Sequence, residues 1–369
     1  MNTAAARVSR ADKVRENDRR VRAALVATIA EQGWSSVTFT GVAKRAGFTV
    51  GALYARAESP SELGNDLWAD EVHGFFVESL DELLAAVESG DAGRVRRFAT
   101  DWDTRTTSAS VLVELLVASL FDDELAEGVG ASARAELTAR CVPTGPADAH
   151  RAAVATLCIC FFLGRALALR STGPLPPLTD DQVTVFSQYA AAPPADLEPA
   201  VRVPLTFLRD PASPASAATD LDRCVIDVLG RVGYRKCTVA RIARAAGVSK
   251  GSLASHFDTK AQFVADAAHR ILLTPLEVWE QYAPVVAAEG PLTARARFLA
   301  EFLRPEHRDL WRINLELAHA ALVVPELAEF ATPPETLPHT HLGVMLVACF
   351  ADGLADLPYA GPFGGGSAT

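Results

Sequence analysis

A short stretch of this chain, residues 249–256, places hydroxyl, ammonium and imidazole groups at helical spacing. Lys250 and Ser252 offer hydrogen-bond donors that suit acceptor atoms on guanine and other base edges in a major groove. Ser249, Ser255 and His256 lie beside them in the chain. Two hundred residues earlier, Val50 and Ala52 occupy the matching positions and offer only apolar contact, for example to a thymine methyl group. The chemistry that these residues allow is recognition, without bond making.

The two stretches belong to an internal repeat. Residues 33–63 align without a gap with residues 233–263. Further along, the repeat continues at an offset of 202, where Glu114 and Leu115 recur as Glu316 and Leu317. A fixed offset over this length indicates duplication of a whole structural unit. The residues that recur identically after 200 positions are Gly33, Thr38, Ala43, Ala46, Gly47, Gly51 and Leu53.

The repeated segment predicts short helices joined by a glycine turn. Thr38 and Thr238 suit the N-cap of one helix, and Gly47 and Gly247 supply the left-handed conformation of a tight turn. Thr49 and Ser249 then cap the next short helix, and capping boxes begin a further one at residues 59 and 259. This is a helix-turn-helix pattern, whose second helix enters the major groove.

Composition favours an all-α protein with room for several domains. Apolar residues make up 49% of the 369 residues, and the alternation typical of strands is hard to find. The net charge of −10 is unevenly spread. Residues 7–63 contain ten Lys and Arg against six Asp and Glu, and residues 219–260 contain eight against four. Basic patches of this kind, rather than the whole-chain charge, attract phosphates.

Several classes of protein are disfavoured. We find no Ser/His/Asp set, glycine-rich phosphate loop or close carboxylate pair, so we expect neither an enzyme nor a cofactor. The polar, Arg-rich N-terminus does not read as a signal peptide, and the apolar run Ala152–Leu163 is too short to span a bilayer. We therefore expect a cytoplasmic protein without a membrane partner, with reduced and mostly buried thiols. Histidines such as His307, His319, His339 and His341 are expected at the surface and not as metal ligands.

The expected organisation is two tandem units joined by a linker. Each unit has a helix-turn-helix segment, which we name the first head and the second head, followed by a helical body. A Pro- and Ala-rich composition predicts that the linker is extended and unpacked. The predicted boundaries are a basic arm at 1–18, the first head at 19–63, the first body at 64–192, the linker at 193–218, the second head at 219–263, a shorter second body at 264–358 and a flexible tail at 359–369.

At this point the chain resembles the TetR/AcrR family of transcriptional regulators. The resemblance rests on IARAAGVSKGSL at residues 242–253 and VAKRAGFTVGALY at residues 42–54, and extends only loosely into the bodies. It implies an all-α protein that usually acts as a homodimer, with recognition helices at Thr49–Arg56 and Ser249–His256. It also implies a double-stranded DNA operator and a small-molecule effector as partners.

Each head departs from the family pattern. The family's phosphate-gripping Tyr is kept as Tyr54 but replaced by Ala254, and its Lys at the start of the fourth helix is kept as Lys260 but replaced by Pro60. We therefore expect the heads to read unlike half-sites, or one head to read while the other positions. The predicted DNA-binding residues are Thr38, Thr40, Thr49, Val50, Ala52, Tyr54, Arg56, Thr238, Arg241, Ser249, Lys250, Ser252, Ser255, His256 and Lys260.

The resemblance further implies an apolar effector pocket in each body. Ligand binding there would move the heads and release DNA, which makes the expected function that of a ligand-responsive repressor. The possible lining residues are Trp68, Phe75, Trp102, Phe121, Trp279, Phe302, Trp311 and His319.

Two alternatives stay open. Because one chain contains two units, it could act as an intrachain pseudo-dimer on one operator. However, the amphipathic segment Asp180–Ala192 has no counterpart in the second unit, so chains could instead self-associate through another surface. The second alternative is a helical protein that binds small molecules or protein partners and whose heads no longer bind DNA.

Overall fold

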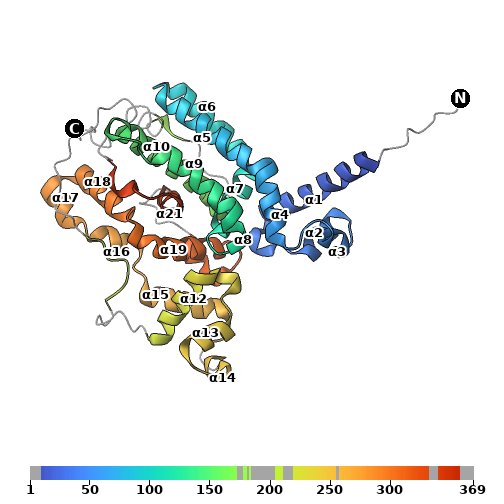
Figure 1. The fold of residues 1–369 in the computed structure, drawn as a ribbon. Coiled ribbons are helices and arrows are strands. Elements are labelled where there is room, and N and C mark those ends of the chain that lie inside the picture. The colour runs from blue at the N-terminus through green and yellow to red at the C-terminus, as the bar shows by residue number, and fades with distance from the viewer. Residues whose placement is uncertain are drawn as a thin grey trace.

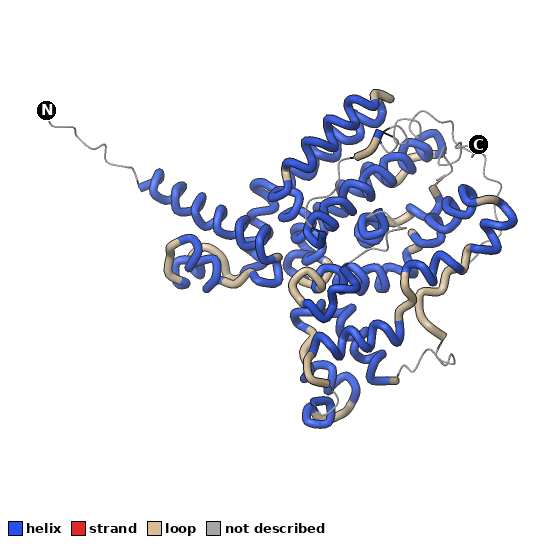
Figure 2. Tube along the Cα trace, turned by 180° about the vertical axis from the view of Figure 1, so that it is seen from behind, coloured by secondary structure: helices blue, strands red, loops and turns tan. Residues whose placement is uncertain are grey.

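The described part of the chain is helical throughout, as the composition predicts. The structure is a computed structural model that describes residues 10–172, 178–180, 183, 204–210, 219–254, 257–331 and 340–357. Within these residues no strand is present, and the one β-bridge joins Leu208 to Leu272 (Figure 2). The two heads project from the helical bodies at separate corners of the molecule (Figure 1).

The first half contains the first head and the first body. The turn after α1 is a short 3-10 helix, η1, at Trp34–Ser36, and a similar turn, η4, lies at Pro146–Asp148. Short π-helical turns lie at Trp68–Val72 (η2) and Ala126–Gly130 (η3). The helices are α1 (Arg10–Gln32), α2 (Phe39–Ala46), α3 (Val50–Tyr54), α4 (Pro60–Leu67), α5 (His73–Glu88), α6 (Ala92–Thr104), α7 (Thr106–Ser119), α8 (Asp123–Leu125), α9 (Ala131–Cys141) and α10 (Ala149–Thr172).

The second half follows a closely similar order. Its helix α19 begins 202 residues after α7, which is the offset of the sequence repeat in the bodies. Short 3-10 turns lie at Pro305–His307 (η5), Pro325–Leu327 (η6) and Leu354–Asp356 (η7). The helices are α12 (Asp220–Lys236), α13 (Val239–Ala246), α14 (Lys250–Ala254), α15 (Lys260–Ile271), α16 (Pro275–Glu280), α17 (Ala283–Glu289), α18 (Pro291–Phe302), α19 (Arg308–Ala320), α20 (Ala328–Ala331) and α21 (Thr340–Phe350).

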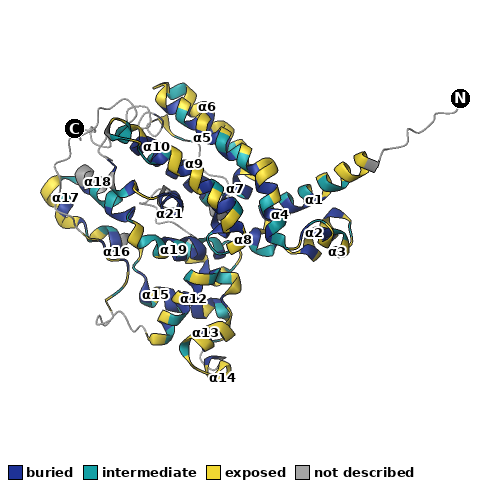
Figure 3. Cartoon of the chain, viewed as in Figure 1, coloured by how far each residue is buried: buried dark blue, intermediate teal, exposed yellow. Residues whose placement is uncertain are grey.

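The halves pack on each other through α10 and α21, which lie in the centre of the molecule (Figures 1 and 3). Gly343 makes this close approach feasible, since a Cβ atom there would lie 1.7 Å from the Cys160 carbonyl oxygen. Arg134 of α9 also donates to the Phe350 carbonyl oxygen at 2.9 Å. The two halves therefore share one apolar core across α10 and α21.

Helix α10 is longer than the apolar run that we judged too short for a membrane. Its segment Ala149–Leu169 has a mean hydropathy of 2.1 and enough length to cross a bilayer. The helix continues through Thr156, whose hydroxyl donates to the Ala152 carbonyl oxygen at 2.8 Å inside the helix. Because 83% of its most apolar window is buried within the protein, α10 fits the central helix of a packed core.

Two boundary predictions need correction. Helix α1 begins at Arg10, so the second half of the expected arm is helical, with Asp12–Arg15 and Glu16–Arg19 ion pairs along it. The expected linker is packed at residues 204–210, because Leu205 and Phe207 are buried and Leu273 N–H donates to the Phe207 carbonyl oxygen at 2.9 Å. Most of the expected helix Asp180–Ala192 lies outside the described residues.

The second head has a core of its own. Val225, Leu229, Ile242, Leu253 and Phe263 are buried together, and α12 packs on α19 of the body. All six cysteines are free thiols, of which only Cys224 is partly exposed; the other five are buried, as the sequence predicts.

An ion pair fixes the start of this head. Asp222 is 2% exposed, accepts from the Arg270 guanidinium at 2.8 Å and caps the N-terminus of α12 together with Thr219. Burial raises the pKa of its carboxyl, but hydrogen bonds from Arg270 and Thr219 outweigh this and hold it below 3.8.

We expect the stability that Asp222 contributes to depend on pH. Since its folded-state pKa is depressed, the contribution is present above pH 3.8 and is lost as the pH falls through the lower folded value. Urea unfolding at pH 5 and pH 3, compared with Asp222→Asn, measures this. The variant should lose less stability on acidification, and an equal loss in both proteins would contradict the assignment.

Candidate nucleic-acid interface

The second head forms a regular helix-turn-helix. The Thr238 hydroxyl accepts from Arg241 N–H at 3.3 Å, and Gly247 takes a φ of 68° that ends α13. The Ser249 hydroxyl accepts from Ser252 N–H at 3.0 Å at the start of α14. Because Leu253 is 2% exposed and anchors α14, the opposite face of this helix is presented to solvent.

The second head carries exposed cations without acidic partners among the described residues. Arg235, Arg241, Arg244 and Lys250 are exposed and form no ion pair with any described residue. Ser249 and Ser252 are exposed beside Lys250. The predicted residues Ser255 and His256 lie outside the described residues. Exposed cations on α13 and at the N-terminal end of α14 are what a phosphate-lined groove would attract.

Lys260 differs from the phosphate-facing position that the family resemblance implies. Its ammonium donates to the Tyr234 carbonyl oxygen at 3.0 Å and lies 3.7 Å from the centre of the Tyr234 ring. Burial lowers its pKa, although the neighbouring Cys237 and Glu316 raise it. In this conformation the Lys260 ammonium stabilises the head internally. The Tyr234 carbonyl oxygen and ring offset the cost of its partial burial.

The first head has the same local geometry. The Thr38 hydroxyl accepts from Gly41 N–H at 3.0 Å, and Gly47 has a φ of 75°. Thr38, Thr40 and Thr49 are exposed, whereas Val50 and Ala52 are half-buried at the start of α3. Val50 packs against the apolar core of the head, and its contact with DNA stays a prediction.

Tyr54 and Arg56 follow on the same head but behave differently. Tyr54 is 62% exposed, with its ring edge held against Phe39 at 4.6 Å. Arg56 is half-buried, donates to Asp18 at 3.1 Å and to the Ala52 carbonyl oxygen at 2.8 Å, and so stabilises the head. Of these two predicted contacts, Tyr54 is accessible and Arg56 is used internally.

Most described cations of the first head are neutralised. Arg22 pairs with Asp70 and Glu71, Arg45 pairs with Glu31, and Arg20 donates to the Ala46 carbonyl oxygen at 2.8 Å. The sequence segment of the first head has more basic than acidic residues, but in the fold acidic side chains lie next to most of its arginines. Among the described residues of the two heads, the cations without an acidic partner are therefore more numerous on the second head.

The predicted pocket residues fall into three separate places. Trp68, Phe75 and Trp102 lie in the first body, with Phe75 stacked on Trp102 at 5.9 Å. In the second body Phe302 stacks on Trp311 at 3.9 Å, and Trp279 packs near Phe298 at 5.1 Å.

Phe121 and His319 lie elsewhere, at the junction between the halves. The Arg312 guanidinium lies 5.2 Å from the centre of the Phe121 ring, and His319 contacts Glu114 at 2.8 Å. They lie at the junction because the turn after α7 meets α19 there, and their part in a ligand pocket stays a prediction. Of the predicted set, His319 lines a cavity at this junction.

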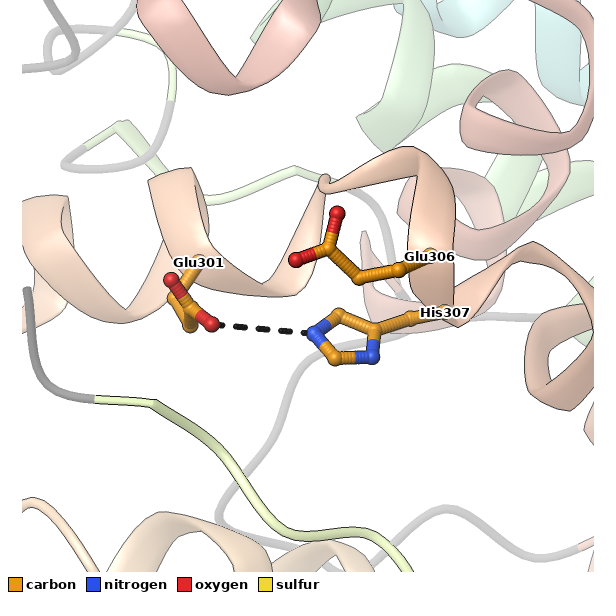
Figure 4. Close-up of side chains that lie close together, drawn as sticks. All are labelled: Glu301, Glu306 and His307. Carbon is orange, nitrogen blue, oxygen red and sulfur yellow. Dashed lines mark ion pairs between the residues drawn. The ribbon is translucent and has the colours of Figure 1, made fainter.

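The sequence also misplaced two histidines. His307 and His319 have side chains only 12% and 13% exposed, since each lies against a buried glutamate. Nε2 of His307 lies 3.8 Å from Oε1 of Glu301, with Glu306 beside them (Figure 4). Arg304 donates to the same Glu301 carboxylate at 2.6 Å, so this carboxylate has a cationic partner within the protein. His339 and the His341 side chain lie outside the described residues.

Two buried carboxylates were missed as candidate residues. Glu114 of α7 accepts from Trp34 N–H at 2.6 Å, and Glu316 of α19 accepts from Tyr234 N–H at 2.5 Å. Each therefore ties the turn after the first helix of a head to the body below it. Their signal in the sequence was an acidic residue repeated at an offset of 202 within an apolar helix.

Comparison with known proteins places the second head in a family. Residues 226–267 match the sequence model of a family described as bacterial regulatory proteins, tetR family. The chain is also similar to an uncharacterised HTH-type transcriptional regulator from Mycobacterium bovis and to two from Mycobacterium tuberculosis, at 36% identity over 66 residues. That similarity covers 18% of this chain and 34% of each relative. Residues 226–267 are thus similar to the helix-turn-helix domain of the TetR family.

Proposed function

We propose that the protein is a sequence-specific DNA-binding transcriptional regulator of the cytoplasm whose second head supplies most of the base readout. The observation that carries this is the exposed N-terminal end of α14, where Ser249, Lys250 and Ser252 are accessible and Lys250 has no acidic partner among the described residues. A helix-turn-helix presents that end of its second helix to base edges. Charge without internal partners is available to displace the counterions of DNA.

The first head then positions the protein on an asymmetric operator. Its arginines are largely neutralised, and its recognition face offers Val50 and Ala52, which suit apolar contact. Tyr54 is its exposed hydroxyl on α3 and suits a phosphate oxygen. The heads accordingly divide positioning and reading between them.

We expect Tyr54→Phe to weaken binding to every duplex by about 0.5–1.5 kcal/mol, the net value of one hydrogen bond. Sequence preference should not change, because a phosphate contact carries no base information. The ring can stay against Phe39, so thermal stability serves as the control. Fluorescence anisotropy with specific and scrambled duplexes measures the effect, and a loss confined to one sequence would contradict it.

A single chain acting as a pseudo-dimer is supported by the contacts between the halves. Helices α10 and α21 pack closely, Arg312 donates to the Leu120 carbonyl oxygen, and Lys236 pairs with Asp122 at 3.0 Å. These contacts pack the two units of one polypeptide against each other, as two chains pack in a homodimer. We propose that one chain occupies one operator.

We further propose that an apolar effector in the first body releases the DNA, which makes the protein a repressor. The aromatic residues Phe75, Phe98 and Trp102 lie together there, and the indole N–H groups of Trp68 and Trp102 are buried without a partner among the described residues. An acceptor on a bound molecule would satisfy such a donor. A bound effector would change DNA binding only if its affinity differs between two arrangements of the heads.

Footprinting on the DNA that flanks the gene, with the mass of the complex measured in solution, tests this function. One chain protecting one asymmetric site is the expected result. Two chains per site, or a perfect palindrome, would overturn the pseudo-dimer and the division between heads. No salt-dependent binding to any duplex would overturn DNA binding as a whole.

The second candidate function is a helical protein that binds small molecules or partners while its heads bind no DNA. The internal engagement of Lys260 and Arg56, two residues that the family resemblance places on DNA, favours it. The exposed, unpaired Lys250 opposes it. Salt-dependent duplex binding separates the two functions.

A further inference from the structure

A cavity lined by both charged and apolar residues lies where the two heads meet the two bodies. Its volume is about 210 Å³, and its wall includes Gln32 and Gly33 of the first head, Tyr234 of the second head and the two buried carboxylates Glu114 and Glu316. Pockets for drug-sized ligands occupy about 300–1,000 Å³. This cavity therefore has the size for one small organic molecule, at a place distinct from the aromatic clusters of the bodies.

The wall contains an acceptor that the protein does not saturate. Glu316 is 8% exposed and places Oε1 on Tyr234 N–H at 2.5 Å. Its other carboxylate oxygen makes no hydrogen bond with any described residue. Burial raises the pKa of this carboxyl, which the nearby His319 and Lys260 counteract in part. A buried carboxylate oxygen in a cavity gains free energy from a charged donor.

The same wall contains donors close to that acceptor. The Lys260 ammonium donates one hydrogen bond to the Tyr234 carbonyl oxygen, at 3.0 Å, and has two further N–H groups that can donate. Arg235 also lines the cavity, is exposed and forms no ion pair among the described residues. These groups suit an anionic oxygen, so the wall offers complements to both a cation and an anion.

An apolar segment completes the wall. Ala320, Leu322 and Val323, which end α19 and follow it, line the cavity, and Val323 is 54% exposed. His319 is occupied by Glu114 at 2.8 Å and so bounds the polar part. A ligand that matches all three regions has an ammonium, a carboxylate and a short apolar group.

We propose that this cavity binds a small α-amino acid with an apolar side chain, its ammonium on Glu316, its carboxylate on Lys260 and Arg235, and its side chain against Leu322 and Val323. Because the wall combines Gly33 of one head with Tyr234 of the other, an occupant fixes the two heads relative to each other. The site does not depend on DNA binding, and it is separate from the proposed effector site in the first body.

Isothermal titration calorimetry on the full chain without DNA tests the proposal, with L-leucine as the probe. We expect saturable binding of one leucine per chain. Two analogues, 3-methylbutylamine without the carboxylate and 4-methylpentanoate without the amine, should each bind about tenfold more weakly or worse, since each leaves one charged group of the wall unmatched. No saturable binding of leucine, or equal binding of either analogue, would overturn the proposal.

Two variants assign the ends of the ligand. Glu316→Gln keeps an oxygen for Tyr234 N–H but removes the charge, and Lys260→Met removes the ammonium; each should weaken leucine binding about tenfold or more. Asp309→Asn, on the exposed side of the same helix α19, is the matched control and should bind like the parent. Circular dichroism checks folding, and the analogue series on the unaltered protein decides the question even if a variant fails to fold. Folded variants with unchanged affinity would show that these residues do not hold the ligand.

Discussion

Gly343→Ala is expected to lower the free energy of unfolding by about 3 kcal/mol or more, the upper end of the cost of overpacking a core. Its Cβ atom would lie 1.7 Å from the Cys160 carbonyl oxygen and 2.7 Å from the Gly164 nitrogen of α10. Both are backbone atoms, so the clash cannot be relieved by turning a side chain. The helices α10 and α21 would have to separate along the contact that joins the two halves.

The matched control is Gly74→Ala in α5, another exchange of a helical glycine. A Cβ atom at Gly74 meets nothing within 4 Å, so alanine should stabilise the helix by about 0.5–1 kcal/mol. Urea unfolding of the three proteins measures both effects. If Gly343→Ala were as stable as the parent, the close packing of α10 on α21 would be wrong.

Lys250→Ala is expected to weaken binding to the specific operator by about 1–3 kcal/mol and to relax specificity at one base pair. Lys250 begins α14, is exposed and has no acidic partner among the described residues. A donor at this end of a recognition helix reaches base edges. Its removal therefore costs affinity at one position more than at the others.

The control is Val50→Ala at the equivalent position of the first head. Val50 is half-buried and offers only apolar surface, so its loss should change affinity much less. Binding-site selection and anisotropy on both variants report specificity and affinity. A uniform loss on all sequences with Lys250→Ala would mean that this lysine contacts phosphate and not a base.

The local structure of the heads could be predicted closely from sequence. Thr38 and Thr238 cap their helices, and Gly47 and Gly247 adopt positive φ, because these preferences depend on neighbours within a few residues. The sequence repeat at an offset of 202 likewise predicted matching helices in the bodies, and α19 begins 202 residues after α7. The tandem arrangement as one functional pseudo-dimer stays a prediction.

The long-range contacts could not be predicted. The sequence counted the arginines of the first head as free charge, whereas Arg45 and Arg56 have acidic partners 14 and 38 residues away. It counted residues 204–210 as linker, whereas Leu205 and Phe207 are buried. Composition shows which residues are present, but it does not show which residues far apart in the sequence are in contact.

The contrast between polar Lys250 and Ser252 in the second head and apolar Val50 and Ala52 in the first was determined by the sequence alone, since side-chain chemistry belongs to each residue type. Only the tertiary structure decided that Lys250 has no acidic partner among the described residues, that Lys260 is held by Tyr234, and that Glu114 and Glu316 face one cavity between the heads. The physical reason is that charge pairing and burial depend on which distant segments the packing of α10 on α21 brings together.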